Sequence, residues 1–319
     1  MIILYVDHDR GVLDPLTLQA LAAARTLDDR VEAALACGAE VPQPLVAELF
    51  DHGVDAVHAA THPQLADFAP LASARALQQL TGRLGPRAVL AAGSARGNEV
   101  MAHLGALLDE PLATDCTELT WTSEGARVLR ARWGGNLLEE AIVHAPIVLA
   151  TTLPHAFPSA QTAGGSGTAQ AWSPELTEAD LAVQVIERIE PTGITGVGLA
   201  EASVIVSGGR GVGGPEGFAP LEELAELLGG TVGCSRVVTS AGWRPHSEQV
   251  GQTGTKVAPD LYIACGISGA TQHLAGCKSS KTLVAINTDR DAPIMHIADY
   301  VIVDDLHAVL PEVIRAIRQ

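Results

Sequence analysis

Residues 203–214 read SVIVSGGRGVGG, a short apolar run that gives way at once to glycines. The run Val204–Val206 has the β-branched composition of a buried strand, and Gly209–Gly214 matches the pattern G-x-G-x-x-G. A helical pattern follows over about residues 218–228. A strand, a glycine loop and a helix in this order predict an α/β layer whose loop lets backbone N–H groups approach a phosphate.

The same alternation continues to the end of the chain and predicts a doubly wound, mainly parallel sheet with flanking helices. Loops 208–214, 249–254 and 266–273, together with Asn287, all fall at the carboxyl ends of expected strands. Open α/β sheets bind ligands at this edge, so we expect a nucleotide cofactor there. The expected elements are strands Thr231–Cys234, Leu261–Cys265, Thr282–Ile286 and Tyr300–Val303, and helices at about 269–276 and 306–318.

A second α/β domain, also built on a mainly parallel sheet, is predicted from the first half of the chain. Three later runs, Arg127–Trp133, Leu137–Val143 and Ile147–Thr152, are expected to add strands at its edge. The other expected elements are strands Ile2–Val6, Val31–Cys37, Val54–Ala60 and Arg87–Ala92, and helices at about 14–26, 41–52, 68–84 and 97–108.

The boundary between the two domains is expected near residue 190. Residues 159–170 form a Gly/Ser-rich loop, a helix is expected over about 175–189, and 190–199 contains a proline and three glycines. We therefore expect domains at 1–190 and 191–319.

Charge and composition exclude several classes of protein. The 319 residues carry 20 Lys+Arg against 37 Asp+Glu, a net charge of −17 that repels nucleic acid and anionic membranes. Membrane insertion is not expected, because no apolar stretch has the length of a spanning helix. The five cysteines are widely spaced and the N-terminus lacks a basic leader and a long apolar core, so we expect a reducing, cytoplasmic location.

Two other functions remain open from the residues alone. The second strand ends at Ser235-Arg236 without the acidic residue typical of NAD sites, but an arginine there suits the 2′-phosphate of NADP. An NADP-dependent oxidoreductase is thus one alternative, although no convincing acid–base set accompanies it. A non-redox adenine-nucleotide module is another. A metal site is not expected, because Asp7, His8, Asp9, His58 and His62 do not complete a ligand set.

Several motifs in order carry a specific resemblance. These are S-G-G-R-G from Ser207, Q-V-G-Q-T-G from Gln249, G-I-S-G-A-x-Q-H-L-A-G from Gly266, and V-A-I-N from Val284. Over 203–319 the chain closely resembles electron-transfer flavoprotein alpha subunits, and over 1–150 it resembles them more loosely. The resemblance implies an FAD-binding C-terminal domain and an N-terminal scaffold for association with a beta subunit.

The resemblance also implies a function. Such a subunit carries electrons from acyl-CoA or related dehydrogenases, as in fatty acid oxidation, to a quinone reductase or another acceptor. It turns over no substrate of its own. AMP or a second FAD, where present, would belong to the beta subunit of the heterodimer.

The resemblance further assigns FAD contacts by position. Of these, Arg236, Thr253 and His273 would tune the redox chemistry. Arg236 and His273 would supply a positive charge or a hydrogen-bond donor beside the flavin ring, and the Thr253 hydroxyl would reach the reactive ring nitrogen. The chain departs from the family pattern at Ser240, Thr255-Lys256 and Thr271. The implied FAD contacts are Arg210, Ser235, Arg236, Val250, Gly251, Gln252, Thr253, Ser268, Gly269, Ala270, Thr271, Gln272, His273, Asn287, Asp305 and Leu306.

Overall fold

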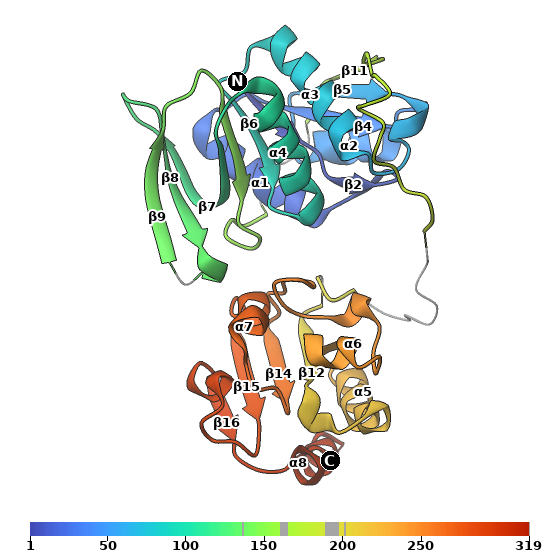
Figure 1. The fold of residues 1–319 in the computed structure, drawn as a ribbon, viewed down its shortest axis with the longest axis vertical. Coiled ribbons are helices and arrows are strands. Elements are labelled where there is room, and N and C mark those ends of the chain that lie inside the picture. Colours follow the sequence, from blue (N-terminus) through green and yellow to red (C-terminus); the bar gives the residue numbers. More distant parts are fainter. Residues whose placement is uncertain (136, 160–164, 189–197, 201, 319) are drawn as a thin grey trace. The chain divides into compact units, whose positions relative to one another are not determined.

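A computed structural model of the chain describes residues 1–135, 137–159, 165–188, 198–200 and 202–318. It contains two compact units, Met1–Arg188 and Ile189–Gln319 (Figure 1). Each unit has a large, mainly parallel sheet with flanking helices, which confirms the predicted fold class. The predicted loops 159–170 and 190–199 lie partly outside the described residues, at 160–164 and 190–197.

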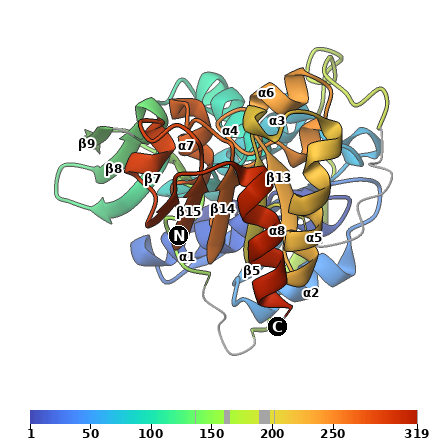
Figure 2. The ribbon, with the colours of Figure 1, turned by 90° about the horizontal axis from the view of Figure 1, so that it is seen from below.

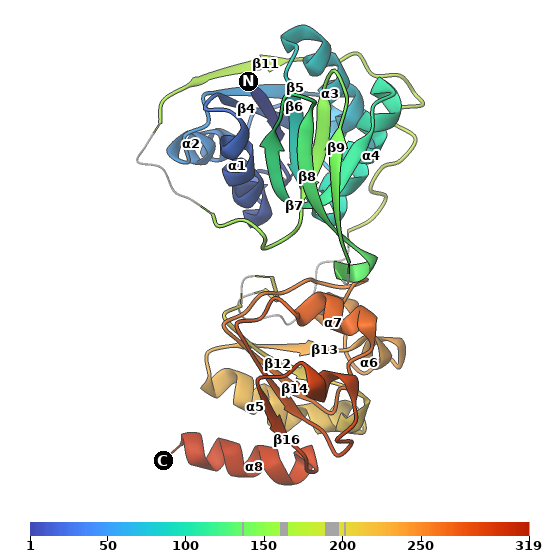
Figure 3. The same ribbon diagram turned by 90° about the vertical axis from the view of Figure 1, so that its left-hand side faces the viewer.

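The first unit is built on a nine-stranded sheet in the order β11-β5-β4-β1-β6-β10-β7-β8-β9. Seven strands run parallel, and β8 and β9 extend the sheet as antiparallel strands beside β7 (Figure 3). A two-stranded hairpin, β2 and β3, follows β1. The strands are β1 (Ile2–Tyr5), β2 (His8–Asp9), β3 (Val12–Leu13), β4 (Val31–Cys37), β5 (Ala56–Thr61), β6 (Ala88–Ala92), β7 (Leu112–Trp121), β8 (Ala126–Arg132), β9 (Leu137–Val143), β10 (Val148–Thr152) and β11 (Thr168–Trp172).

Helices cover both faces of this sheet. Side chains of β1 alternate, so that Ile2 and Leu4 join the core beneath α1 and α2, whereas Ile3 joins the core beneath α3 and α4. The expected start of α1 is confirmed, because the carboxylate of Asp14 accepts a hydrogen bond of 2.8 Å from the backbone N–H of Leu16. The helices are α1 (Pro15–Leu27), α2 (Gln43–Asp51), α3 (Pro70–Leu84) and α4 (Ala95–Leu108).

Two predictions for the first unit are wrong. The run expected as an edge strand, β10, lies between β6 and β7 and is buried along its whole length. The helix expected over 175–189 does not form in its described part, residues 175–188. Side chains of α3 hold this segment instead, since Arg75 pairs with the buried Asp180 and the Gln79 amide bonds the backbone of Glu175.

The second unit has a five-stranded, fully parallel sheet in the order β13-β12-β14-β15-β16. Helices α5 and α8 lie side by side over one face (Figure 2), and α7 packs on the other. The predicted strands and helices are present, and the short helix α6 was not predicted. The elements are β12 (Val204–Gly208), α5 (Ala219–Leu227), β13 (Thr231–Cys234), α6 (Arg236–Ser240), β14 (Leu261–Cys265), α7 (Thr271–Cys277), β15 (Thr282–Ile286), β16 (Tyr300–Ile302) and α8 (Leu306–Ile317).

Candidate functional site

The strand order of the second unit creates a place for a ligand. From β12 the chain passes through α5 to β13 on one side, and it later returns to β14 on the other side of β12. The loops after β12 and β14 therefore diverge at the carboxyl edge, which is the topological switch point where open α/β sheets bind ligands. A cavity of about 550 Å³ lies at this edge.

The cavity gathers most of the predicted cofactor contacts. It is lined by residues that follow β12, β13, β14 and β15, so side chains distant in sequence meet there. The predicted residues that line it are Arg210, Ser235, Arg236, Val250, Gly251, Gln252, Thr253, Ser268, Gly269, Ala270, Gln272, His273 and Asn287. Further lining residues are Gly211, Val237, Ser240, Gln249, Gly266, Ile267 and Asp289.

Three predicted contacts lie apart from this lining. Thr271 is the first residue of α7. The carboxylate of Asp305 accepts a hydrogen bond of 2.9 Å from the N–H of His307 and so caps α8. Leu306 is buried in the core, where its side chain lies close to Gly266. Asp305 and Leu306 therefore stabilise the start of α8.

Glycines let the two diverging loops touch. The N–H of Gly211 donates to the carbonyl of Gly266 at 3.0 Å, and a Cβ on Gly211 would lie 2.8 Å from the Cα of Gly266. A Cβ on Gly209 would meet the Gly266 carbonyl oxygen at 2.3 Å. Gly266 has φ +62°, a left-handed conformation that other residues rarely adopt. The loops at the floor of the cavity can pack this closely only without side chains.

Asn287 joins the loops that follow β14 and β15. Its side-chain amide donates to the carbonyl of Ile267 at 2.8 Å, and its side-chain oxygen accepts from the N–H of Asp289 at 3.0 Å. The predicted contact is thus also a brace that holds one wall of the cavity in place.

Two guanidinium groups give the cavity positive charge. Arg210 and Arg236 line it, both are exposed, and neither forms an ion pair with another described residue. Asp289 is the one carboxylate on the described lining. In a chain of net charge −17, this excess of positive charge favours an anionic ligand.

His273 lines the cavity and carries a buried ring nitrogen without a described partner. Its Nε2 lies 3.0 Å from the hydroxyl of Tyr262, whereas the buried Nδ1 has no hydrogen-bond partner among the described residues. Burial lowers the pKa of His273 to about 4, with the Val250 backbone opposing part of this effect. His273 is therefore neutral near pH 7, and it offers hydrogen-bonding capacity rather than the positive charge considered from the sequence.

The first unit has a similar strand-to-helix glycine loop, at residues 92–97, but it is closed. A Cβ on Gly93 would lie 2.2 Å from the Thr152 carbonyl oxygen, and the Ser94 hydroxyl donates to the buried carboxylate of Asp7 at 2.5 Å while it also caps α4. Arg96 lies across this edge and pairs with Asp9. The Ser94 hydroxyl and the Arg96 guanidinium of this loop are therefore already bonded to groups of the first unit.

The histidines and carboxylates of the first unit make other contacts. The ring of His8 bonds the Ala36 carbonyl, His58 pairs with the buried Glu32 at 2.7 Å, and His62 caps a short 3₁₀ turn. The described residues contain no group of three His, Cys, Asp or Glu side chains that could hold a metal ion.

Comparisons with known proteins agree with this geometry. Residues 2–177 match the electron transfer flavoprotein domain, and residues 198–278 match the electron transfer flavoprotein FAD-binding domain. The chain belongs to the electron transfer flavoprotein alpha-subunit family. It is similar to electron transfer flavoprotein subunit alpha of Bacillus subtilis, with 38% identity over 94% of this chain and 92% of the relative.

Other members of the family show comparable similarity over the whole length. The subunit alpha of Thermoanaerobacterium thermosaccharolyticum is 36% identical over 99% of this chain and 97% of its own. Protein FixB of Clostridium saccharobutylicum is 37% identical over 97% and 94%. As a family member the chain is an electron carrier, not an enzyme with its own substrate turnover.

The match to the family's FAD-binding domain lies within the unit that holds the cavity, and the residues present fit an FAD. They supply close-packed backbone loops, the side chain of His273 and two guanidinium groups that form no ion pair with another described residue. The NADP alternative loses its support, because the glycine loop does not open a helix. It contains one 3₁₀ turn, Arg210–Val212, and leads into a second, Pro215–Phe218, before α5 begins at Ala219.

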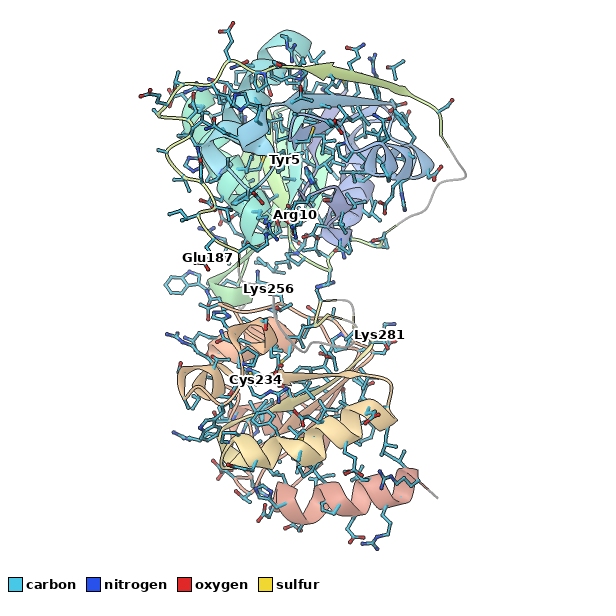
Figure 4. The ribbon with its side chains drawn as sticks, turned by 90° about the vertical axis from the view of Figure 1, so that its right-hand side faces the viewer. Tyr5, Arg10, Glu187, Cys234, Lys256 and Lys281 are labelled. Carbon is cyan, nitrogen blue, oxygen red and sulfur yellow. The ribbon has the colours of Figure 1, made fainter. Side chains whose placement is uncertain are left out.

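The predicted contacts leave out seven lining residues. All except Ser240 stand within two residues of a predicted contact, and four of them lie in the loops expected to bind a ligand. The seven are Gly211, Val237, Ser240, Gln249, Gly266, Ile267 and Asp289. Two buried cysteines, Cys234 and Cys265, stand at the ends of β13 and β14 (Figure 4, Cys234). Burial raises the pKa of both to about 12, so both thiols are protonated near pH 7.

Proposed function

We propose that this subunit binds FAD in the cavity of its second unit, within a heterodimer formed with a beta subunit. It carries electrons from acyl-CoA or related dehydrogenases to a quinone reductase or another acceptor, with fatty acid oxidation as the setting and the cytoplasm as the compartment. When bound, the flavin supplies the one- and two-electron chemistry. AMP or a second FAD would occupy the beta subunit. No helix among the described residues is long and apolar enough to cross a membrane.

The observation that carries this proposal is the composition of the cavity wall. Arg210 and Arg236 bring positive charge to an acidic chain, and His273 brings a buried polar atom that needs a partner. The amides of the loop Ser268–Ala270 suit the pyrophosphate, and Arg236 and His273 stabilise negative charge on the reduced ring system. The first unit, with its closed glycine loop, serves as the scaffold for the beta subunit.

The test is to co-express the chain with its beta subunit and to record the visible spectrum of the purified complex. We expect stoichiometric FAD and a yellow protein. Replacing Arg236 with alanine should weaken FAD binding and lower the flavin potential, because the reduced ring loses a stabilising charge. Arg315→Ala is the matched control, since Arg315 lies near the end of α8 and away from the cavity lining. A colourless complex that binds NADP instead would overturn the proposal.

A further inference from the structure

On the cavity lining, the side-chain amide of Gln249 is hydrogen-bonded through both its oxygen and its nitrogen. It is 2% exposed and stands between α6 and the loop that carries Thr253. Its Oε1 accepts a hydrogen bond of 2.6 Å from the hydroxyl of Thr239, and its Nε2 donates to the hydroxyl of Thr253 at 3.0 Å. Gln249 thereby connects a residue outside the cavity lining to one on it.

The two distances fit one orientation of the Gln249 amide. A separation of 2.6 Å is usual for O–H···O bonds and short for N–H···O bonds, whereas 3.0 Å is the common N–H···O separation. The oxygen of Gln249 therefore faces Thr239 and its nitrogen faces Thr253. The hydroxyl of Thr239 also lies 3.0 Å from the Arg236 carbonyl, but the contact to Gln249 is the shorter one.

This orientation decides what the Thr253 hydroxyl can do. Its oxygen already receives a hydrogen from Gln249, so its own hydrogen must go to another acceptor. The described residues offer Thr253 no hydrogen-bond acceptor for that hydrogen, and the side chain lines the cavity. The remaining direction is toward the ligand.

We infer that Gln249 is a positioning residue that holds the Thr253 hydroxyl as a hydrogen-bond donor to an electron-rich atom of the bound ligand. The inference rests on the proposed FAD site. With the flavin as ligand, a fixed donor stabilises the form that carries more negative charge and so raises the midpoint potential. With the amide reversed, Thr253 would donate to Gln249 instead, and that stabilisation would be lost.

A double-mutant cycle on the FAD-loaded complex tests this role. Gln249→Met keeps the length of the side chain and removes the amide, while Thr253→Val removes the hydroxyl. We expect each single variant to lower the flavin midpoint potential and to weaken FAD binding roughly three- to tenfold, the effect of one neutral hydrogen bond. Because Gln249 acts through Thr253, Gln249→Met should add nothing in the Thr253→Val background. Equal shifts in both backgrounds would refute the inference.

Thr239 provides a second variant, outside the cavity lining. Thr239→Val removes the donor that orients the Gln249 amide and should lower the potential, whereas Thr239→Ser keeps the hydroxyl and should restore the wild-type value. A fall with Thr239→Ser as large as with Thr239→Val would show a packing effect and contradict the inference. Failure of the wild-type complex to bind FAD would instead overturn the proposed function, so the two failures are distinguishable.

Discussion

The hydroxyl of Tyr262 lies 3.0 Å from Nε2 of His273, and both side chains are buried. Burial raises the pKa of Tyr262 well above its usual value and lowers that of His273 to about 4. Both groups are therefore neutral near pH 7. His273 also lines the cavity, and its buried Nδ1 has no hydrogen-bond partner among the described residues.

The lowered pKa of His273 predicts an acid-dependent loss of stability. In the unfolded chain His273 takes up a proton below about pH 6.5, whereas in the folded chain it stays neutral until about pH 4. The contribution of His273 to the free energy of unfolding is thus constant above pH 6.5. Between pH 6.5 and pH 4 it falls by roughly 3 kcal/mol, because each pKa unit corresponds to about 1.4 kcal/mol.

Urea unfolding at pH 7 and pH 4 measures this effect. The free energy of unfolding should fall further in the wild type than in His273→Gln, which cannot be protonated, by roughly 3 kcal/mol. All other titrating groups are common to the two proteins, so they cancel in the comparison. Identical pH profiles would show that His273 is not held neutral.

Replacing Tyr262 with phenylalanine should destabilise the second unit. The change leaves Nε2 of His273 buried without its partner, at a cost of about 1–3 kcal/mol in the free energy of unfolding. The control is Tyr300→Phe, because Tyr300 is 65% exposed on the edge strand β16. An unchanged urea midpoint for Tyr262→Phe would mean that the hydroxyl contributes no net hydrogen bond.

Two glycines with nearly equal φ angles separate the effect of backbone strain from that of crowding. Gly269 has φ +84° and Gly213 has φ +87°, so alanine is strained at both. A Cβ on Gly269 would lie 2.5 Å from the backbone nitrogen of Ile294, whereas at Gly213 nothing lies within 4 Å. We expect Gly213→Ala to cost about 1–2 kcal/mol and Gly269→Ala about 3 kcal/mol or more.

Urea unfolding and FAD binding distinguish the two variants. Gly269→Ala should also lose FAD, because its loop must shift away from Ile294, while Gly213→Ala should retain it. Equal destabilisation by the two variants would show that the loop after β14 can accommodate the added methyl group.

The strands of the second unit could be predicted because each is a short apolar run bounded by glycine or polar residues. Thr231–Cys234, Leu261–Cys265 and Thr282–Ile286 are observed at the predicted bounds. Sheet order in the first unit could not be predicted in the same way. The run that forms β10 has the apolar composition of any buried strand, and only its contacts with β6 and β7 place it inside the sheet.

The site, like the fold, could be predicted only in part. Glycine loops and strand ends indicated where a ligand would bind, since the carboxyl ends of parallel strands meet at one edge. The protonation of His273 and the direction of the Gln249 amide depend on burial and on partners far away in sequence, such as Tyr262. Such properties arise from packing and have no signature in the sequence.

The last prediction concerns the buried carboxyl of Asp7 in the first unit. The carboxyl of Asp7 is 4% exposed and accepts a hydrogen bond of 2.5 Å from Ser94. Burial raises its pKa above the usual value, even though Ser94 and Arg96 act in the opposite direction. A carboxyl whose folded pKa is raised favours the folded state only while protonated, so this contribution is present at low pH and is lost as pH rises through that pKa.

Asp7→Asn should therefore raise the free energy of unfolding at pH 7, because the amide oxygen can still accept from Ser94 without the cost of a buried charge. At pH 3 the difference should shrink, since the wild-type carboxyl is then protonated in both states. Urea unfolding at the two pH values measures this, with Asp51→Asn on the exposed end of α2 as the control. Destabilisation by Asp7→Asn at pH 7 would mean that the ionised carboxylate, held by Ser94 and Arg96, stabilises the first unit.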